Sequence, residues 1–286
     1  MVAAQDAGRF ARAGTRHRFT ARRGIVESVT LAAPVMLRVR VSGADFADFP
    51  ATGPTDHMRV FFPDPATGEY RAPVAAGPGE DGIVRPDDPT FARDFTPLRV
   101  LRTDDAVAIE FDVYTHPSPG PAAVWAAGAA AGDELVVVGP RGSRAAPQGA
   151  GRVLVVADET ARPAAARFAS DVPATTAVEV IAATADDGAW VADYLADASG
   201  RAGILVRPVA VGPDPGDALV QALTAAGVDD GTYVFAAGEA SALLPVRRHL
   251  LAALALPREQ FSVSGYWRRG TAGFDHHTPV DPDDPD

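Results

Sequence analysis

Cysteine and lysine are both absent from this chain of 286 residues. Without cysteine there is no disulfide framework, no thiolate iron–sulfur cluster and no cysteine zinc site, so redox chemistry requires a bound organic cofactor. Without lysine, Schiff-base chemistry is excluded, and all 26 basic residues are arginines. No apolar run is long enough to span a membrane, and no long apolar segment follows the N-terminal charges. We therefore expect a cytoplasmic protein with no membrane partner.

Positive charge is scarce, and the formal net charge is −11. Sequence-independent binding of nucleic acid depends on many Lys and Arg contacts to phosphate, so no nucleic-acid partner is expected. The hydrophobic fraction of 47% supplies the cores of two domains of modest size.

Alternating apolar residues predict a small antiparallel β-barrel over residues 16–147. The alternation is clear in MLRVRVSG, HMRVFF, VAIEFDVY and ELVVVG, and Gly- and Pro-rich turns separate these segments. The first fifteen or so residues have no period, and we expect them to fray. The connection over 63–89 is long for a compact domain, so it is expected to be mobile or to cover a ligand.

After Pro147 the pattern changes to strands that alternate with helices. RVLVVADE is a continuous apolar run, typical of a strand that is buried on both faces. The alternation predicts an α/β domain with a doubly wound parallel sheet over 150–270, and a ligand site at the carboxyl ends of its strands. Residues 271–286 are acidic and include His276 and His277, and we expect a disordered tail there rather than a metal site.

Two segments carry residue types that suit a flavin dinucleotide. In RDFTPLR, an extended backbone places Arg93 and Phe95 on one face and Thr96 on the other. An arginine fork can bind a pyrophosphate, and an aromatic ring can lie against a flavin. In GPAAVW, Gly120 and Pro121 begin a short helix whose free N–H groups suit a phosphate. Taken alone, RDFT favours a plain edge strand that exposes one arginine.

Seven segments, in a fixed order between about Arg23 and Gly270, resemble the siderophore-interacting proteins. These proteins are FAD-dependent ferric-siderophore reductases built like a ferredoxin reductase. The segments are TDHMRVFFP, RDFTPLR, GPAAVW, GDELVVVGPRGS, ADETARPA, AAGEASALLPVRRHL and GYWRRG. The resemblance implies a barrel that binds FAD, an α/β domain that binds NADPH or NADH, and reduction of a ferric siderophore to release ferrous iron. Since the flavin carries the chemistry, no catalytic side chain and no metal ligand is expected.

The resemblance also implies which residues form the sites. Those for FAD are His57, Arg93, Phe95, Thr96, His116, Gly120, Pro121, Ala122 and Trp125, with Tyr266 and Trp267 beside the flavin. Those for the nicotinamide nucleotide are Asp158, Glu159, Thr160, Gly238 and Glu239. Many ferric chelates are anionic, so a basic substrate pocket is expected from Arg38, Arg59, Arg141, Arg268 and Arg269.

Several of these assignments keep a structural alternative. His57, His116, Tyr266 and Trp267 fit packing or turn-capping roles equally well, and Thr160 is expected to cap the helix that follows it. NADH and NADPH are not distinguished, because Arg162, Arg247 and Arg248 are candidates for binding a 2′-phosphate but also fit solvated helix faces.

Three residues depart from the family pattern. Phe95 stands where relatives carry tyrosine, Leu98 replaces an arginine with Arg99 one residue later, and Ala157 replaces a glycine. Two other functions therefore stay open: a general flavin oxidoreductase with another acceptor, and a non-catalytic flavin- or siderophore-binding protein. A monomer is expected in each case.

Overall fold

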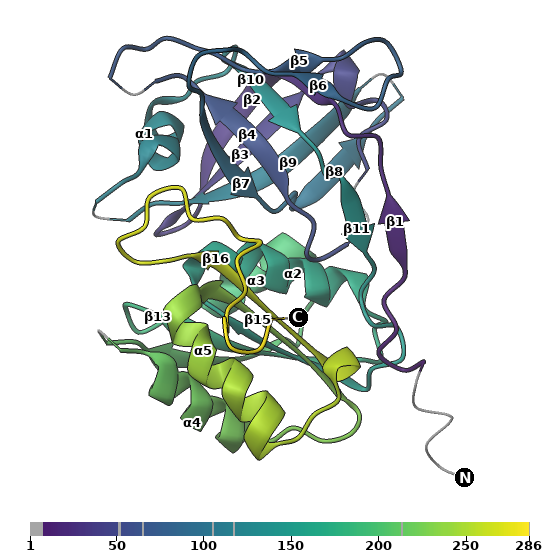
Figure 1. Cartoon of the computed structure of the whole chain (residues 1–286), viewed down its shortest axis with the longest axis vertical. Helices are drawn as coiled ribbons and strands as arrows, with labels where there is room; N and C mark the ends of the chain where they lie inside the picture. Colours follow the sequence, from purple (N-terminus) through teal and green to yellow (C-terminus); the bar gives the residue numbers. More distant parts are fainter. Residues whose placement is uncertain are drawn as a thin grey trace. The chain divides into compact units, whose positions relative to one another are not determined.

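The computed structural model describes residues 8–50, 53–64, 66–104, 106–116, 118–212 and 214–285. These residues form two compact units. Residues 13–145 make up one of them, the barrel unit, and residues 8–12 and 146–285 make up the other, the α/β unit (Figure 1). No helix in the described ranges is long and apolar enough to cross a membrane.

The barrel unit is built on a seven-stranded antiparallel sheet with the strand order β7-β4-β10-β2-β3-β9-β8. Its strands are β2 (Ala21–Ala33), β3 (Met36–Ser42), β4 (Met58–Phe62), β7 (Phe91–Phe95), β8 (Arg99–Arg102), β9 (Val107–Tyr114) and β10 (Glu134–Val138). Two small pairs accompany the sheet, β1 (Gly14–Arg16) with β11 (Gly142–Arg144) and β5 (Val74–Ala75) with β6 (Ile83–Val84). The helical elements are the 3₁₀ turn η1 (Ala44–Phe46) and α1 (Pro121–Gly128).

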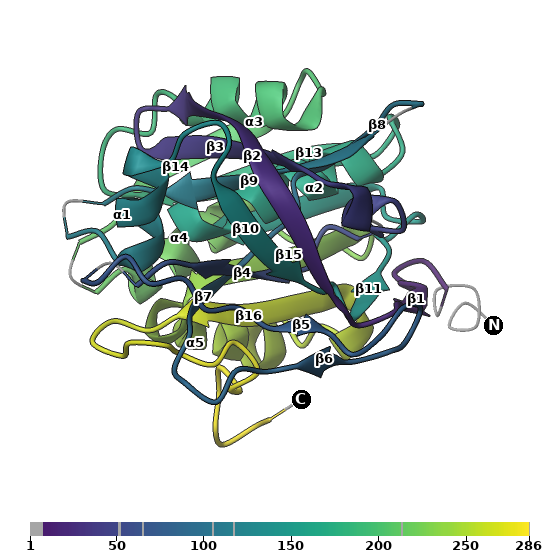
Figure 2. The same ribbon diagram turned by 90° about the horizontal axis from the view of Figure 1, so that it is seen from above.

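The sheet curls on itself and encloses an apolar core. The ring of Phe95, on the edge strand β7, lies 5.0 Å from the ring of Phe111 on β9, which is next to the opposite edge. Because side chains alternate along each strand, every second residue points inward, and Val39, Val41 and Val60 are completely buried. Helix α1 packs against β4 and β7 (Figures 1 and 2). The predicted antiparallel barrel is confirmed.

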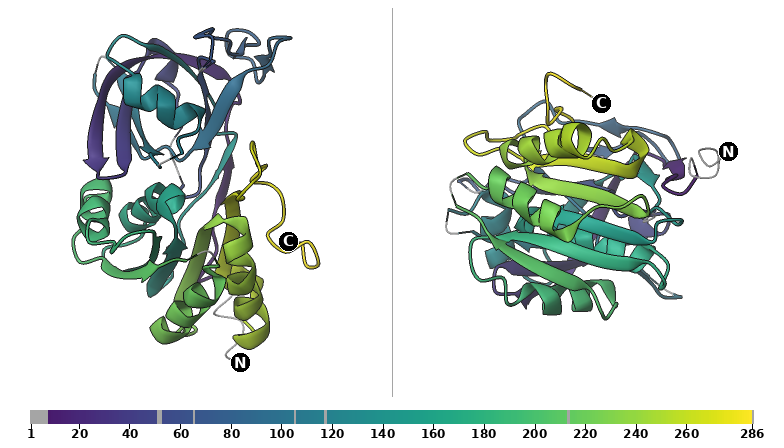
Figure 3. Two further views of the ribbon diagram at one scale, coloured as in Figure 1. Left: turned by 90° about the vertical axis from the view of Figure 1, so that its left-hand side faces the viewer. Right: turned by 90° about the horizontal axis from the view of Figure 1, so that it is seen from below.

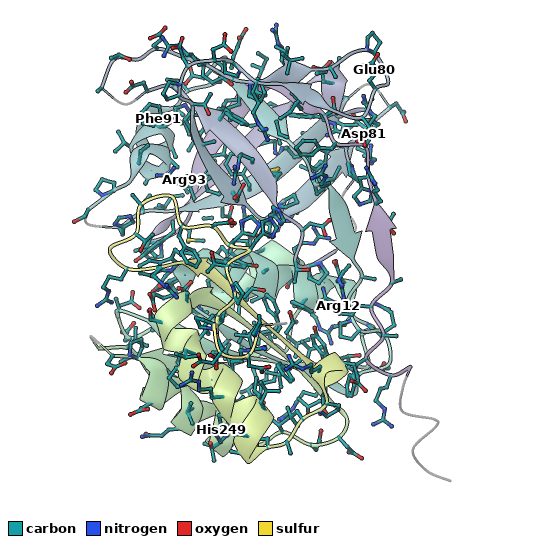
Figure 4. The ribbon with its side chains drawn as sticks, viewed as in Figure 1. Arg12, Glu80, Asp81, Phe91, Arg93 and His249 are labelled. Carbon is teal, nitrogen blue, oxygen red and sulfur yellow. The ribbon has the colours of Figure 1, made fainter. Side chains whose placement is uncertain are left out.

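The long connection between β4 and β7 is folded against the outer face of the barrel. Tyr70 and Ile83 pack on apolar side chains of β2, β4 and β10. The backbone N–H of Phe19 donates to Asp81 Oδ1 over 2.6 Å (Asp81 is labelled in Figure 4). These contacts attach the 63–89 segment to the barrel, whereas its length alone suggests a mobile segment or a cover for a ligand.

The α/β unit has a five-stranded parallel sheet with the order β14-β13-β12-β15-β16. Its strands are β12 (Arg152–Ala157), β13 (Ala177–Thr184), β14 (Leu205–Ala210), β15 (Thr232–Glu239) and β16 (Phe261–Trp267). Its helices are α2 (Arg162–Asp171), α3 (Val191–Ser199), α4 (Gly216–Ala226) and α5 (Ala240–Arg248). Shorter turns are η2 (Glu159–Ala161), η3 (His249–Ala253) and η4 (Arg258–Gln260).

Helices cover both faces of this sheet (Figure 3). Helices α4 and α5 pack on the face that carries Leu154, Ile181 and Val234. Helix α2 packs on the opposite face, where the ring centroids of Phe168 and Phe235 lie 4.7 Å apart. Coverage on both faces explains why the central strands are continuously apolar, and it confirms the predicted doubly wound α/β fold.

Residues 8–12 pack on the α/β unit, although the missing period in this part of the sequence predicts fraying. Phe10 is buried, and its ring lies 6.1 Å from that of Tyr233 on β15. Arg12 donates to the Tyr233 hydroxyl over 3.1 Å. An aromatic contact and a hydrogen bond to a distant strand therefore hold the segment. Residues 1–7 lie outside the described ranges.

The acidic C-terminal segment also packs on the α/β unit, where its composition predicts a disordered tail. Val280 is only 6% exposed and belongs to the core beneath α5. Asp281 accepts hydrogen bonds from Arg248 through both carboxylate oxygens, at 2.7 and 3.0 Å. Asp284 pairs with Arg247. Composition does not reveal this packing because the arginines that neutralise the acidic segment lie 26 to 37 residues earlier in the chain.

Candidate functional site

A pocket opens at the carboxyl ends of β12 and β15 in the α/β unit. The chain runs from β12 to β13 and β14 on one side of the sheet and returns to β15 and β16 on the other, so the strand order reverses between β12 and β15. Doubly wound sheets bind nucleotides in the crevice at this point. The pocket has a volume of about 260 Å³ and is lined by the end of β12, the β14–α4 loop and the start of α5. It is slightly smaller than typical ligand clefts, so it encloses only part of a dinucleotide.

Asp158 joins the ends of three strands at this pocket. Its Oδ1 accepts hydrogen bonds from the backbone N–H of Thr160 (2.9 Å) and from the Thr160 hydroxyl (2.6 Å). Its Oδ2 accepts from the backbone N–H of Glu239 (2.9 Å), at the end of β15, and from Trp267 Nε1 (2.8 Å), at the end of β16. The cap of the turn after β12 is therefore Asp158. Helix α2 is preceded by Ala161 and has no side-chain cap, so the prediction that Thr160 caps this helix is wrong.

Gly238 lies against this carboxylate and has no room for a side chain. Its φ is +144°, and a Cβ atom on this residue would lie 2.5 Å from Asp158 Oδ2. The pairing of β15 with β16 also shifts register after Gly238, so that Glu239 pairs with Trp267. Glycine is required here because it permits both the backbone conformation and the close approach of the carboxylate.

Two glutamates flank Asp158 at the pocket. Glu239 caps α5, since its Oε2 accepts from the N–H of Ala242 (2.7 Å) and its Oε1 accepts from the N–H of Arg269 (3.1 Å). Glu159 accepts from the N–H of Ala185 through Oε1 (3.4 Å). Burial raises the pKa of Glu159 above its ordinary value. These three carboxylates are thus held largely by backbone donors.

Arg162 lies completely buried at the start of α2. Its guanidinium donates to the carbonyl oxygens of Ala157 and Ala183, at the ends of β12 and β13, and lies 5.9 Å from the ring of Trp190. Desolvation by burial lowers its pKa. Arg162 therefore holds two strand ends together, and it is not the solvated arginine that the sequence suggests.

In the barrel unit, β7 and α1 offer groups that fit a pyrophosphate. Arg93 is exposed on β7, beside α1, and donates to the carbonyl of Ala92 over 2.7 Å (Figure 4). Gly120 precedes α1 without any side-chain cap, and Pro121 has no N–H to satisfy. The N–H groups that follow have no acceptor within the helix, so the positive end of α1 can receive a phosphate oxygen. An exposed guanidinium on β7 and the uncapped N-terminus of the helix that packs on this strand are groups that fit the pyrophosphate of FAD.

The aromatic side chains of the same region are partly committed to the barrel core. Phe95 is half-buried, with its ring 6.0 Å from Phe62 and 5.0 Å from Phe111. Trp125 on α1 is also half-buried, with its ring 5.0 Å from Phe62. Thr96, directly after β7, is buried. The exposed parts of the Phe95 and Trp125 rings are the surfaces that an isoalloxazine ring can contact.

Comparison with known proteins identifies the family. Residues 25–144 match the sequence model of the siderophore-interacting FAD-binding domain, and residues 150–270 match that of the siderophore-interacting protein. A solved structure described as a siderophore utilization protein from T. fusca is 34% identical, covers 93% of this chain and 99% of that chain, and has a TM-score of 0.78. The chain belongs to the siderophore-interacting protein family. The resemblance read from the seven segments is confirmed, and the FAD-binding domain of the family corresponds to the barrel unit.

Two curated relatives of this siderophore-interacting protein have names that state an activity. The NADPH-dependent ferric-chelate reductase of Escherichia coli (strain K12) is 37% identical over 132 residues, which are 46% of this chain and 48% of that protein. This match therefore spans about half of each protein. The ferric vibriobactin reductase ViuB of Vibrio cholerae is 25% identical over 239 residues, covering 82% of this chain and 84% of that protein.

The other cofactor candidates of this siderophore-interacting protein lie at strand ends. His57 directly precedes β4 in the barrel unit. His116 is exposed between β9 and α1, with its ring 5.7 Å from that of Tyr114. Tyr266 is half-buried on β16, next to Trp267. Their positions agree with either the cofactor role or the structural role that the sequence leaves open.

The departures from the family pattern have local consequences. Leu98 is buried, and Arg99 pairs with Glu110 over 3.1 Å, so neither side chain replaces the arginine of the family pattern. Ala157 is buried at the end of β12 and lines the pocket, so its methyl group takes space that a glycine would leave open. Arg93 and the N-terminus of α1 stay the candidates for phosphate binding in the barrel unit.

The arginines expected to form one basic substrate pocket are in different situations. Arg38 is buried and donates to both oxygens of Asp112, at 2.8 and 2.9 Å, so the prediction of an available charge is wrong for Arg38. Arg59 forms the same paired contact with Asp94 but is exposed. Arg141 lies 5.0 Å from the ring of Phe19, and Arg268 lies 5.4 Å from the ring of Phe274. Arg38, Arg59 and Arg141 belong to the barrel unit, while Arg268 and Arg269 belong to the α/β unit.

The arginines considered for a 2′-phosphate do not line the pocket. Arg162 is buried behind it, and Arg247 and Arg248 bind the C-terminal segment. Sequence reasoning missed Asp214, which lines the pocket from the β14–α4 loop. The signal was present, because GPDPGD directly follows a strand whose carboxyl end is expected at the ligand site.

Proposed function

We propose that this protein is an FAD-containing reductase that takes electrons from NADPH or NADH and reduces a ferric siderophore, releasing ferrous iron in the cytoplasm. The observation that carries the proposal is the pocket at the ends of β12 and β15, because a nicotinamide nucleotide needs such a crevice. The names of the Escherichia coli and Vibrio cholerae relatives support a ferric chelate as the electron acceptor.

The barrel unit holds the flavin. Arg93 and the N–H groups at the start of α1 bind the pyrophosphate, and Phe95 with Trp125 contacts the ring system. FAD held by these residues would supply hydride acceptance and one-electron transfer, chemistry that no side chain of this protein supplies.

The α/β unit holds the nucleotide in a preorganised pocket. Asp158 fixes the ends of β12, β15 and β16 relative to one another, and Gly238 allows its carboxylate to approach the backbone. Glu239 fixes the start of α5. Because these groups are already hydrogen-bonded to one another, little ordering remains to be done when the nucleotide binds.

Ferric iron is the substrate in this scheme, and the protein has no need to coordinate it. Siderophores bind Fe³⁺ through hard oxygen donors, and these hold Fe²⁺ less tightly, so reduction releases the ion. Exposed arginines such as Arg59, Arg141 and Arg269 attract an anionic chelate to a protein with a net charge of −11.

An anaerobic spectroscopic titration tests the proposal. Purified protein is expected to show bound flavin absorbance that bleaches with NADPH or NADH and returns when a ferric siderophore is added with a ferrous-specific dye. Free FAD at the same concentration is the control. A flavin that bleaches but ignores ferric siderophores indicates a general flavin oxidoreductase. A flavin that bleaches with neither nucleotide indicates a binding protein without reductase activity.

A further inference from the structure

The pocket in the α/β unit has a strong excess of negative charge. Four carboxylates line it, those of Asp158, Glu159, Asp214 and Glu239. Among its described lining residues, Arg269 is the only basic one. NADH and NADPH differ only in the 2′-phosphate on the adenosine ribose of NADPH, which adds about two negative charges at neutral pH. The charge of the pocket therefore affects whether NADH or NADPH binds more tightly.

Three of the four carboxylates are compensated by donors of the protein. Asp158 accepts four hydrogen bonds, and Glu239 accepts two from backbone N–H groups. Glu159 accepts one backbone N–H and is attracted by the buried guanidinium of Arg162. A carboxylate that is already hydrogen-bonded to fixed donors repels a nearby phosphate less than a carboxylate without such partners.

Asp214 is different from these three. It is exposed in the β14–α4 loop, and within the described part of the chain its carboxylate makes no hydrogen bond or ion pair. The loop offers no positive charge to balance it, and Asp217 adds a second carboxylate in the first turn of α4. Arg207, on β14, forms an ion pair with Glu179. This side of the pocket is therefore negative.

The positive charge lies toward the other edge of the sheet. Arg269 follows β16, and Asp214 follows β14, and these are the two edge strands. Between them, the N-terminus of α5 is already capped by the carboxylate of Glu239. A dinucleotide that places its pyrophosphate toward Arg269 has its adenosine ribose on the side of Asp214.

We propose that this pocket selects NADH over NADPH and that Asp214 determines the selection. Its carboxylate accepts a hydrogen bond from the ribose 2′-hydroxyl of NADH and repels the 2′-phosphate of NADPH, as acidic residues do in other doubly wound nucleotide domains. The inference rests on the proposed function, because it assumes that the nicotinamide nucleotide binds in this pocket. It separates this chain from its Escherichia coli relative, whose name states NADPH dependence.

The test measures binding and turnover on the FAD-loaded protein. Calorimetric titration compares adenosine 5′-monophosphate with adenosine 2′,5′-bisphosphate, which differ by the same 2′-phosphate and need no redox step. Flavin reduction gives kcat/KM for NADH and NADPH. We expect the monophosphate to bind more tightly and NADH to be favoured by about tenfold or more, because like charges brought together across an interface cost a large part of the binding energy.

Two variants assign the effect to one side chain. Asp214→Asn removes the charge at the pocket. We expect it to reduce severalfold both the ratio of the two adenosine phosphate affinities and the ratio of kcat/KM for NADH to that for NADPH. The KM for NADPH is expected to fall. Asp217→Asn removes the same charge three residues away, outside the pocket lining, and is expected to change both ratios much less than Asp214→Asn does. Equal narrowing by the two variants would show a general charge effect and would overturn the role of Asp214.

The two proposals fail in different ways. If NADPH reduces the flavin as well as NADH or better, or if the bisphosphate binds as tightly as the monophosphate, the selection is overturned and the reductase stands. If neither nucleotide reduces the flavin and neither adenosine phosphate binds, the proposed function itself is overturned, and the selection with it.

Discussion

Gly238 is the residue at which the pocket of the α/β unit tolerates the least change. In Gly238→Ala, the new methyl group would lie 2.5 Å from Asp158 Oδ2 on a backbone with φ of +144°. We expect a loss of about 1–3 kcal/mol in the free energy of unfolding, typical of forced backbone strain, and weaker nucleotide binding. Urea unfolding and calorimetric titration measure the two effects. The matched control is Gly212→Ala, at the same pocket, where the new methyl group would face open space. Equal stability of the two variants would contradict the predicted strain and close contact at Gly238.

Arg93 is the residue on which flavin retention is expected to depend most. Because Leu98 is buried and Arg99 pairs with Glu110, we expect Arg93 to bind the pyrophosphate together with α1. Arg93→Ala is expected to lose FAD during purification, and the ratio of flavin to protein absorbance measures the loss. Arg85→Ala removes another exposed arginine, in the connection before β7, and is expected to keep its flavin. Full flavin occupancy in Arg93→Ala would rule out the assignment.

At the scale of elements, we expect acid to release the C-terminal segment from its packing on the α/β unit. The hydrogen bonds from Arg248 hold the pKa of Asp281 below its ordinary value. A carboxyl group whose pKa is lowered by folding stabilises the folded state above the unfolded pKa of about 3.9, and this stabilisation disappears as the pH falls through the lower folded value. We therefore expect faster amide hydrogen exchange around Val280 below about pH 4, after correction for the intrinsic effect of pH on exchange.

The same release is expected at neutral pH in Asp281→Asn, since the amide cannot form the ion pair. Asp283→Asn is the matched control, because Asp283 is 88% exposed and its single contact with Arg248 contributes little. If the segment is as well protected from hydrogen exchange in Asp281→Asn as in the unmodified protein, then the packing of Val280, rather than the ion pair, holds it.

Elements were more predictable from the sequence than the contacts between them. The apolar run RVLVVA identifies β12 because a strand covered on both faces needs no polar residues. The role of Asp158 was not predictable, since its partners Glu239 and Trp267 lie 81 and 109 residues later and become neighbours only through the strand order. The prediction that Arg38 offers a charge to the substrate was wrong for the same reason. The register of β3 against β9 places Asp112 opposite Arg38, and this register is not visible in the sequence.

At the scale of the whole molecule, the change of pattern near Pro147 marked the transition between two folds, and the structure divides the chain close to it. The ends of the chain were harder to predict. Residues 8–12 and the acidic C-terminal segment both pack on the α/β unit, through contacts to parts of the chain that are remote in sequence. The composition of a segment gives no information about contacts with residues that are distant in sequence and become neighbours only in the folded structure.

The α/β unit should therefore lose stability when its N-terminal segment is altered. Phe10→Ala removes a buried ring that packs against Tyr233, and we expect a cost of about 2–4 kcal/mol, at or below the usual cost of truncating a buried phenylalanine because the segment is near the chain end. Hydrogen exchange measured by mass spectrometry should show faster exchange in β12 and β15 and unchanged exchange in the barrel unit. Arg9→Ala, which removes an exposed hydrogen bond to Asp230 from the same segment, is the control with a small expected effect. Unchanged exchange in β15 of Phe10→Ala would mean that the segment adds nothing to the α/β unit, and its boundary would then lie at residue 146.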